Sequence, residues 1–218
     1  MEHDESFPRR ALLSWADDNL REFPWRDRSR SFYEVFLAEF LLTQTPAENV
    51  ADVYPDLCER YADLADLAAA SESELESAIE PLGFQRMRAA ALSEIAANVD
   101  SLPRDGDGLR DLPRVGPYVA DATRCFALAE PVPIVDRNVV RVYGRLFGDE
   151  FPESDADRRT FAASLLPEDG ERARTYNLAL LDFGATVCTR RDPDCENCPL
   201  RERCAYATGE TQADREGV

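Results

Sequence analysis

Apolar residues recur every three or four positions along most of the chain, which is the spacing of one face of an α-helix. The pattern predicts helices over residues 11–20, 33–42, 47–61, 73–80, 86–99, 117–128, 137–147, 156–165 and 171–184. Prolines and glycines fall between these segments, and the alternation typical of strands is scarce. We therefore expect an all-α protein with two lobes and a cleft between them.

The size of the chain fits this expectation. Its 218 residues, 44% of them hydrophobic, suit one large or two small domains with a real core. The longest apolar run, residues 35–42, contains Glu39 and is too short to span a membrane. The chain opens MEHDESFPRR without an apolar signal segment, so we expect a cytoplasmic protein.

Charge narrows the possible chemistry. The chain contains no lysine, so all 25 basic residues are arginine, and its only histidine is His3. A side-chain amine nucleophile is therefore excluded, and histidine catalysis is disfavoured. The net charge of −18 is typical of proteins from a high-salt cytoplasm and opposes binding to a polyanion at ordinary salt. A nucleic-acid partner would have to be held by local arginines, backbone amides and base contacts.

Four cysteines follow one another near the end of the sequence: Cys188, Cys195, Cys198 and Cys204, spaced C-x6-C-x2-C-x5-C. Disulfides are not expected without export to an oxidising compartment. Structural zinc sites usually carry two C-x2-C pairs, and only one is present. Four thiolates in one compact loop favour a cubane-type iron–sulfur cluster over zinc. Cys58 and Cys125 lie in amphipathic segments and are interpreted as core residues.

Two carboxylates are candidates for catalysis. Glu39 lies among apolar residues in YEVFLAEFLLTQT. If it is buried, loss of hydration raises its pKa toward that of a useful general acid. The alternative is a surface position on a polar stripe with Glu34. Asp136 directly precedes the predicted helix 137–147, so it is either an N-cap alone or a cap that keeps one ionised oxygen free for chemistry.

Three turns could contact DNA. LPRVGPYVADAT places Arg114, Val115 and Gly116 before a helix whose first turn holds Tyr118, and amides at such a helix start can bind a phosphate. The alternative is an ordinary turn between helices. Gln44 and Phe84 lie on turns and could fill a gap in a base stack. Otherwise Gln44 contacts the C-terminal end of its helix and Phe84 is a core residue. We expect Trp25, in FPWR, to be a packing residue.

These motifs occur together, in this order, in one family. FPWR, AEFLLTQT, LPRVGPYVADA, VDRNVVRV, LLDFGATVC and the cysteine series make the chain resemble the helix-hairpin-helix DNA glycosylases, which include endonuclease III, the MutY adenine glycosylases and the thymine mismatch glycosylases. The resemblance implies a six-helix barrel with the hairpin over residues 27–131. A second lobe, residues 1–26 and 132–218, would carry a [4Fe–4S] cluster on the four cysteines. The implied partner is double-stranded DNA with a mispaired or damaged base, bound by a monomer.

The resemblance also implies roles for single residues. Asp136 matches the aspartate that stabilises the cationic sugar, and Glu39 matches the glutamate that contacts or protonates the flipped base. Gln44 and Phe84 match residues that plug the duplex after flipping. Tyr118 falls where bifunctional members place a Schiff-base lysine, so this chain is expected to cut only the base–sugar bond.

Two departures from the family pattern matter. Arg114 replaces the first glycine of the usual Leu-Pro-Gly-Val-Gly hairpin, so either the turn tolerates a side chain there or the arginine adds a phosphate contact on a strained backbone. MutY proteins usually continue into a further domain that checks for 8-oxoguanine, and this chain stops soon after the cysteines. The second departure weakens the interpretation as an enzyme for adenine opposite 8-oxoguanine and leaves room for thymine or uracil opposite G. We expect a monofunctional glycosylase for adenine opposite G or 8-oxoguanine, or for thymine or uracil opposite G. The alternatives are a glycosylase–lyase using the N-terminal amine and a non-catalytic iron–sulfur DNA-binding module.

Overall fold

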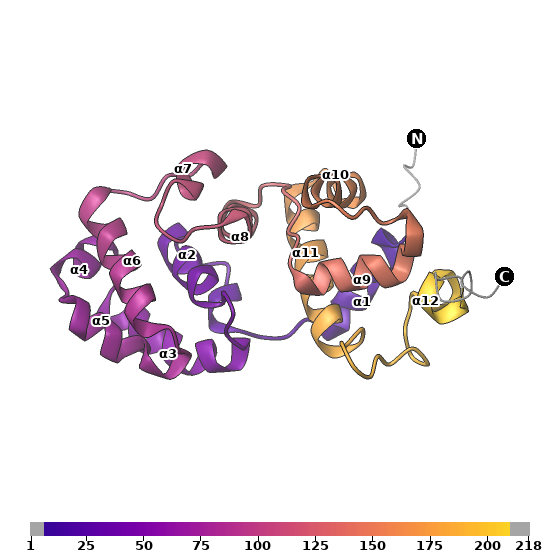
Figure 1. The fold of residues 1–218 in the computed structure, drawn as a ribbon, viewed down its shortest axis with the longest axis horizontal. Coiled ribbons are helices and arrows are strands. Elements are labelled where there is room, and N and C mark those ends of the chain that lie inside the picture. Colours follow the sequence, from indigo (N-terminus) through magenta and orange to yellow (C-terminus); the bar gives the residue numbers. More distant parts are fainter. Residues whose placement is uncertain (1–6, 210–218) are drawn as a thin grey trace. The chain divides into compact units, whose positions relative to one another are not determined.

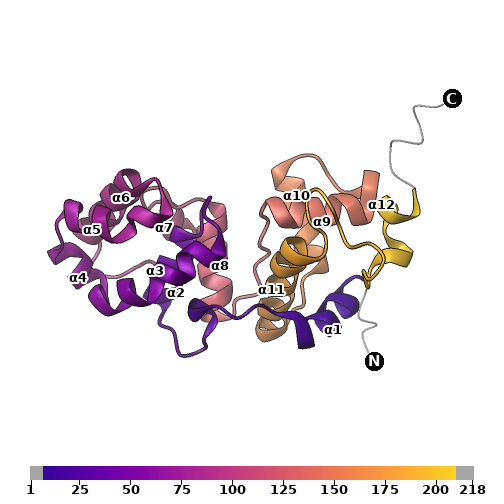
Figure 2. The same ribbon diagram turned by 90° about the horizontal axis from the view of Figure 1, so that it is seen from below.

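The structure is a computed structural model that describes residues 7–209, and His3 lies outside these residues. Within this range the chain contains helices and turns but no strand, so the prediction of an all-α fold is confirmed. Two compact units form. One is Glu22–Leu128, and the other joins residues 7–21 to residues 129–209 (Figures 1 and 2).

The unit Glu22–Leu128 contains seven successive α-helices. These are α2 (Phe32–Leu41), α3 (Ala47–Arg60), α4 (Leu64–Ala69), α5 (Glu72–Ile79), α6 (Gln85–Asn98), α7 (Gly106–Arg110) and α8 (Pro117–Leu128). Helix α2 is buried at every position from Val35 to Leu41 and packs against α8. Trp25 is also buried and meets the Tyr54 ring edge-on, which confirms its predicted packing role.

Local sequence explains why α2 begins where it does. The Ser31 hydroxyl accepts from the Glu34 amide, and the Glu34 side chain accepts from the Ser31 amide, which forms a capping box. The apolar run that follows covers the helix on all sides, so the helix becomes the centre of the core. Glu39 is carried into that core by the helix.

The second unit contains α1 (Arg9–Asn19), α9 (Arg137–Phe147), α10 (Asp155–Leu165), α11 (Gly170–Thr186) and α12 (Ala205–Thr208). Helix α11 packs against both α1 and α9. A Cβ on Gly184 would come within 2.8 Å of the Asn138 Cβ, so glycine allows α9 and α11 to approach closely. At the other side of α11, the buried Asp182 accepts hydrogen bonds from the backbone and guanidinium of Arg21.

The long periodic helices were predicted within a few residues, and α8 and α9 have the predicted bounds. The short helices α4, α7 and α12 were not predicted. Helix α7 lies between the predicted helices 86–99 and 117–128, and Asp105 caps it by accepting from the Gly108 amide. No helix in residues 7–209 is long and apolar enough to cross a bilayer.

Candidate active site

Glu39 is a buried carboxyl group, with 2% of its surface exposed. The hydroxyl of Tyr118, on the first turn of α8, donates a hydrogen bond to Glu39 Oε2 at 2.9 Å. The packing of α8 on α2 therefore joins two residues that lie 79 positions apart in the sequence. The alternative of a surface position beside Glu34 is wrong, because Glu39 is buried. Glu34 itself serves the capping box and pairs with Arg30.

Burial has a clear electrostatic consequence for Glu39. Loss of hydration raises the pKa of its carboxyl from the ordinary value near 4.5 to about 7. The Tyr118 hydrogen bond and the nearby charge of Arg26 oppose this rise, since both favour the ionised form. Arg26 belongs to the FPWR motif, which therefore does more than place Trp25 in the core. A carboxyl with this pKa can give or accept a proton near neutral pH.

Asp136 caps helix α9. Its Oδ1 accepts from the Val139 amide at 2.7 Å, as predicted for an N-cap, and its Oδ2 accepts from Asn138 Nδ2 at 2.9 Å. Each oxygen thus accepts one hydrogen bond and keeps a lone pair for a further donor. Burial raises the pKa of this carboxyl, although the hydrogen bonds from Val139 and Asn138 pull it down. The direction is opposite to the one that the positive helix end alone predicts.

A hydrogen-bonded chain connects Asp136 to the cysteine loop. Asn138 Oδ1 accepts from Arg141, and the same guanidinium donates to the carbonyls of Gly184 and Cys188 at 2.6 and 2.8 Å. Sequence reasoning missed both residues. The run DRNVVR contained the signal, because Asn138 and Arg141 stand three residues apart and so share a helix face with each other.

The hairpin before α8 has a left-handed residue at Arg114, with φ of 60°. An arginine in this conformation is strained, whereas glycine would not be. The Arg114 side chain is exposed. The Val115 amide donates to the Leu112 carbonyl at 3.1 Å, whereas the Gly116 amide has no acceptor within residues 7–209. Of these two amides, the Gly116 amide is therefore the one that an anion could accept a hydrogen bond from.

Gln44 and Phe84 are both exposed and both left-handed, with φ of 60° and 53°. Phe84 exposes 52% of its surface, so its interpretation as a core residue is wrong. Gln44 follows the end of α2, and Phe84 directly precedes α6. Each side chain therefore stands at the tip of a short loop of the unit Glu22–Leu128.

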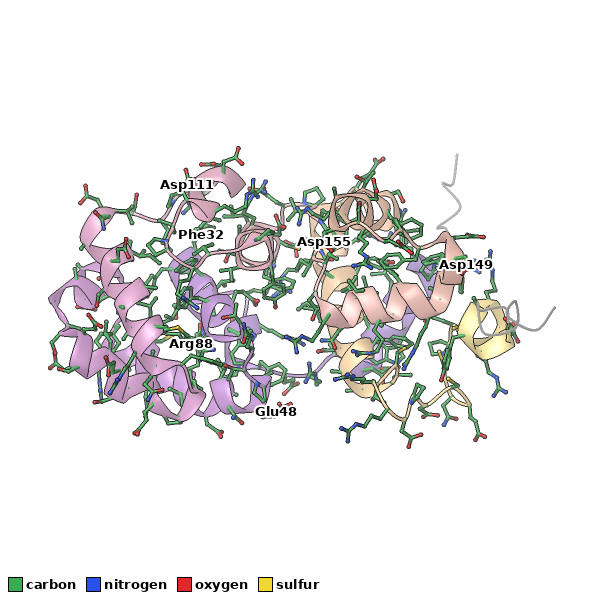
Figure 3. The ribbon with its side chains drawn as sticks, viewed as in Figure 1. Phe32, Glu48, Arg88, Asp111, Asp149 and Asp155 are labelled. Atoms are coloured by element: carbon green, nitrogen blue, oxygen red, sulfur yellow. The ribbon has the colours of Figure 1, made fainter. Side chains whose placement is uncertain are left out.

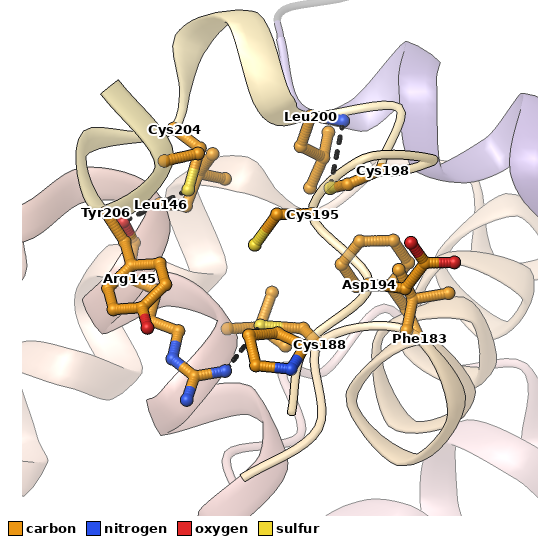
Figure 4. A pocket seen from close by; sticks show the side chains of 14 residues that line it. Arg145, Leu146, Phe183, Cys188, Asp194, Cys195, Cys198, Leu200, Cys204 and Tyr206 are labelled. Atoms are coloured by element: carbon orange, nitrogen blue, oxygen red, sulfur yellow. Dashed lines mark hydrogen bonds between the residues drawn. The ribbon is translucent and has the colours of Figure 1, made fainter. Parts of the chain in front are cut away.

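The four predicted cysteines line one pocket in the other unit (Figure 4). The remaining walls are mostly apolar side chains of α9, α11 and the loop, including Val142, Leu146, Phe183 and Leu200. Arg145 donates to Cys188 Sγ at 3.4 Å and to the Thr189 carbonyl at 2.6 Å. In residues 7–209, no three thiol, imidazole or carboxylate groups are arranged to hold one metal ion. Cys125 is buried and Cys58 packs against the core, as expected.

Comparison with known proteins agrees with these observations. Residues 37–167 match the model of the HhH-GPD superfamily of base excision DNA repair proteins. A thymine/uracil-DNA glycosylase of Pyrobaculum aerophilum is 36% identical over 202 residues, covering 88% of this chain and 87% of the relative. An adenine DNA glycosylase of Mycolicibacterium smegmatis is 41% identical over 196 residues, covering 87% of this chain and 66% of the relative. The structure of a thermostable thymine-DNA glycosylase is similar with a TM-score of 0.86 and 32% identity, over 92% of this chain and 95% of that one.

Proposed function

The chain belongs to the HhH-GPD superfamily of base excision DNA repair proteins, and we propose that it is a monofunctional DNA glycosylase. It would hydrolyse the N-glycosidic bond of a mispaired base in double-stranded DNA. Its relatives are named thymine/uracil-DNA glycosylase and adenine DNA glycosylase. The observation that carries this proposal is the buried Glu39, whose pKa of about 7 suits a proton donor and whose side chain is fixed by the hydrogen bond from Tyr118. The absence of lysine from the sequence argues against a lyase step through a side-chain amine.

We assign Glu39 to the base and Asp136 to the sugar. The protonated Glu39 would donate a proton to the leaving base, so that the bond breaks without building negative charge on the ring. The ionised Asp136 would stabilise the positive charge that develops on the sugar and orient the attacking water. The water adds to the sugar carbon and releases its proton to solvent, from which Glu39 regains one, and an abasic site and the free base result. Tyr118 would line the base pocket and hold Glu39 in place.

Other residues would bind the duplex. The Gly116 amide and the Arg114 side chain would contact a phosphate, with Val115 keeping the turn closed through Leu112. Gln44 and Phe84 would occupy the space that the flipped base leaves. Because the chain has 43 acidic and 25 basic residues, we infer a high-salt cell interior, in which surface repulsion from DNA is screened.

We propose that the four cysteines hold a [4Fe–4S] cluster and not zinc. They line a common, mostly apolar pocket, and their spacing contains only one of the two C-x2-C pairs that structural zinc sites usually carry. When bound, the cluster would cross-link the loop 188–204 at four points, and we give it no role in cutting the base–sugar bond. Iron and sulfide analysis should find about four of each per chain. One zinc per chain would contradict the assignment.

An excision assay tests the proposed function and identifies the base. Duplexes with A·G, A·8-oxoguanine, T·G and U·G pairs are incubated with cluster-loaded protein at molar salt, and free base is measured by mass spectrometry. The Asp136→Asn variant is the control, because asparagine also caps helices and should keep the fold. Release of a base by the wild type alone supports the proposal. Failure on all four duplexes would contradict it.

A further inference from the structure

Arg88 is a charged residue in the interior of the unit Glu22–Leu128, on the first turn of α6 (Figure 3). Only 4% of its surface is exposed. The acceptors of its side chain are all uncharged oxygens of two loops, residues 42–45 and residues 82–84, and no carboxylate pairs with it within residues 7–209. A buried guanidinium with this set of partners calls for an explanation, because burying a charge is costly.

The first set of contacts encloses Gln44. Arg88 Nη2 donates to the Thr43 carbonyl and to the Thr45 hydroxyl, both at 2.6 Å. These acceptors belong to the residues immediately before and after Gln44. The guanidinium therefore holds both ends of the loop 42–45 on whose tip the Gln44 side chain stands.

The second set of contacts fixes Phe84. Arg88 Nη1 donates to the carbonyls of Leu82 and Gly83 at 3.2 and 3.1 Å. The same guanidinium carbon lies 5.9 Å from the centre of the Phe84 ring, within the range of a cation–π contact. The two loops also meet directly, since the Thr45 hydroxyl lies 3.4 Å from the Leu82 carbonyl, to which it donates.

Both loops need such support because their tips are strained. Gln44 and Phe84 are left-handed without being glycine, and a residue in this conformation costs about 1 kcal/mol or more. Strained residues persist only where surrounding contacts fix them. Arg88 provides those contacts to both loops from a single planar group, which a lysine ammonium could not do with the same geometry.

We propose that Arg88 is a positioning residue that fixes Gln44 and Phe84 relative to each other, so that the two side chains enter the DNA base stack as one rigid unit. This inference rests on the proposed function, because it assumes that both side chains act in the duplex. A displacement of about 1 Å can cost about a hundredfold in rate, so fixing the two loops has a measurable value. The competing interpretation is that Arg88 only stabilises the fold.

The first experiment needs no DNA. Hydrogen exchange of the amides in the loops 42–45 and 82–84 is followed by mass spectrometry in the wild type, Arg88→Lys and Ile95→Ala. Ile95 is a buried residue two turns further along α6 and lies outside both loops, so its variant reports a general loss of stability. We expect Arg88→Lys to speed exchange in both loops together by at least about tenfold over Ile95→Ala. Unchanged exchange in either loop would overturn the proposal.

The second experiment measures opening of the base stack. A 2-aminopurine beside the mispair reports flipping in stopped-flow fluorescence, at a temperature where all variants are folded. Arg88→Lys should open the stack at least about tenfold more slowly than Ile95→Ala. Gln44→Ala and Phe84→Ala should be coupled by at least about threefold in the wild type and independent in the Arg88→Lys background. Equal opening by the two variants, or unchanged coupling, would overturn the proposal.

Two further arms keep the result interpretable. If Arg88→Lys does not fold, Thr45→Val replaces it in both experiments. This variant removes the hydroxyl that joins both loops and should show the same changes to a smaller extent. Wild-type behaviour of Thr45→Val would then contradict the proposal. If the wild type excises no base from any duplex, the proposed function fails. The exchange experiment still decides whether Arg88 fixes both loops.

Discussion

Replacing Tyr118 by phenylalanine tests the pairing on which the chemistry depends. The substitution removes the hydroxyl that donates to Glu39 Oε2 at 2.9 Å and leaves the ring in place. That hydrogen bond favours the ionised carboxylate and lowers its pKa, whereas burial raises the pKa to about 7. Without the hydroxyl, only Arg26 opposes the effect of burial. The pKa of Glu39 should therefore rise above 7.

The size of the rise follows from the strength of the lost bond. A hydrogen bond to a charged group contributes about 1.5–3 kcal/mol, and one pKa unit corresponds to about 1.4 kcal/mol. The rise would be about one to two units if nothing replaced the hydroxyl. Because water entering the vacated space would restore part of the bond, we expect a shift of about one unit, to a pKa near 8.

Single-turnover excision measured between about pH 5 and pH 10 reports this pKa. If Glu39 acts as a proton donor, the rate falls above its pKa, so the alkaline limb should move from about 7 in the wild type to about 8 in Tyr118→Phe. Tyr33→Phe is the matched control, because its hydroxyl donates to the Tyr61 carbonyl and not to Glu39. An alkaline limb that stays at 7 or moves downward in Tyr118→Phe would refute the reasoning.

Three further substitutions separate stability from activity. Glu39→Gln should raise the free energy of unfolding by about 3 kcal/mol more at pH 8 than at pH 4, because the Glu39 carboxyl ionises near 4.5 in the unfolded chain and near 7 in the folded one. Equal changes in urea titrations at both pH values would argue against a buried acid. Asp136→Asn should lower the excision rate by about 10²–10³-fold. It should change the free energy of unfolding by less than about 1 kcal/mol, because asparagine keeps the helix cap, and a larger loss of stability would contradict the role of Asp136 in catalysis. Arg114→Gly should relieve left-handed strain and raise the free energy of unfolding by about 0.5–1 kcal/mol. It should also lower the slope of the logarithm of DNA affinity against the logarithm of salt concentration by about 1, and an unchanged slope would disprove the phosphate contact.

The sequence predicted the long helices well because their stability comes from apolar faces that are visible as a period of three to four residues. Helices α8 and α9 matched residue for residue. Helices α4 and α7 escaped because they span only six and five residues, too few to show a period. Two glycines in the GDGLR sequence of α7 disfavour a helix, and the Asp105 cap prevails over them.

The sequence indicated candidate residues for the site but not their surroundings. The cap at Asp136 followed from its position before a helix. The burial of Glu39 did not, since it depends on α8 packing against α2 and so on contacts between distant parts of the chain. Arg88 was missed for a related reason. A lone arginine in a helix is usually exposed, and only the folded structure shows that two loops surround it.

The most direct test of the central claim is the product of one turnover. A duplex that supports excision is end-labelled, reacted at molar salt with enzyme in excess, and divided into samples with and without hot alkali, with borohydride in a third. A hydrolytic glycosylase without lysine should release the base and yield strand breaks only after alkali, and borohydride should trap no protein–DNA adduct. Strand breaks without alkali, or a trapped adduct, would contradict the account.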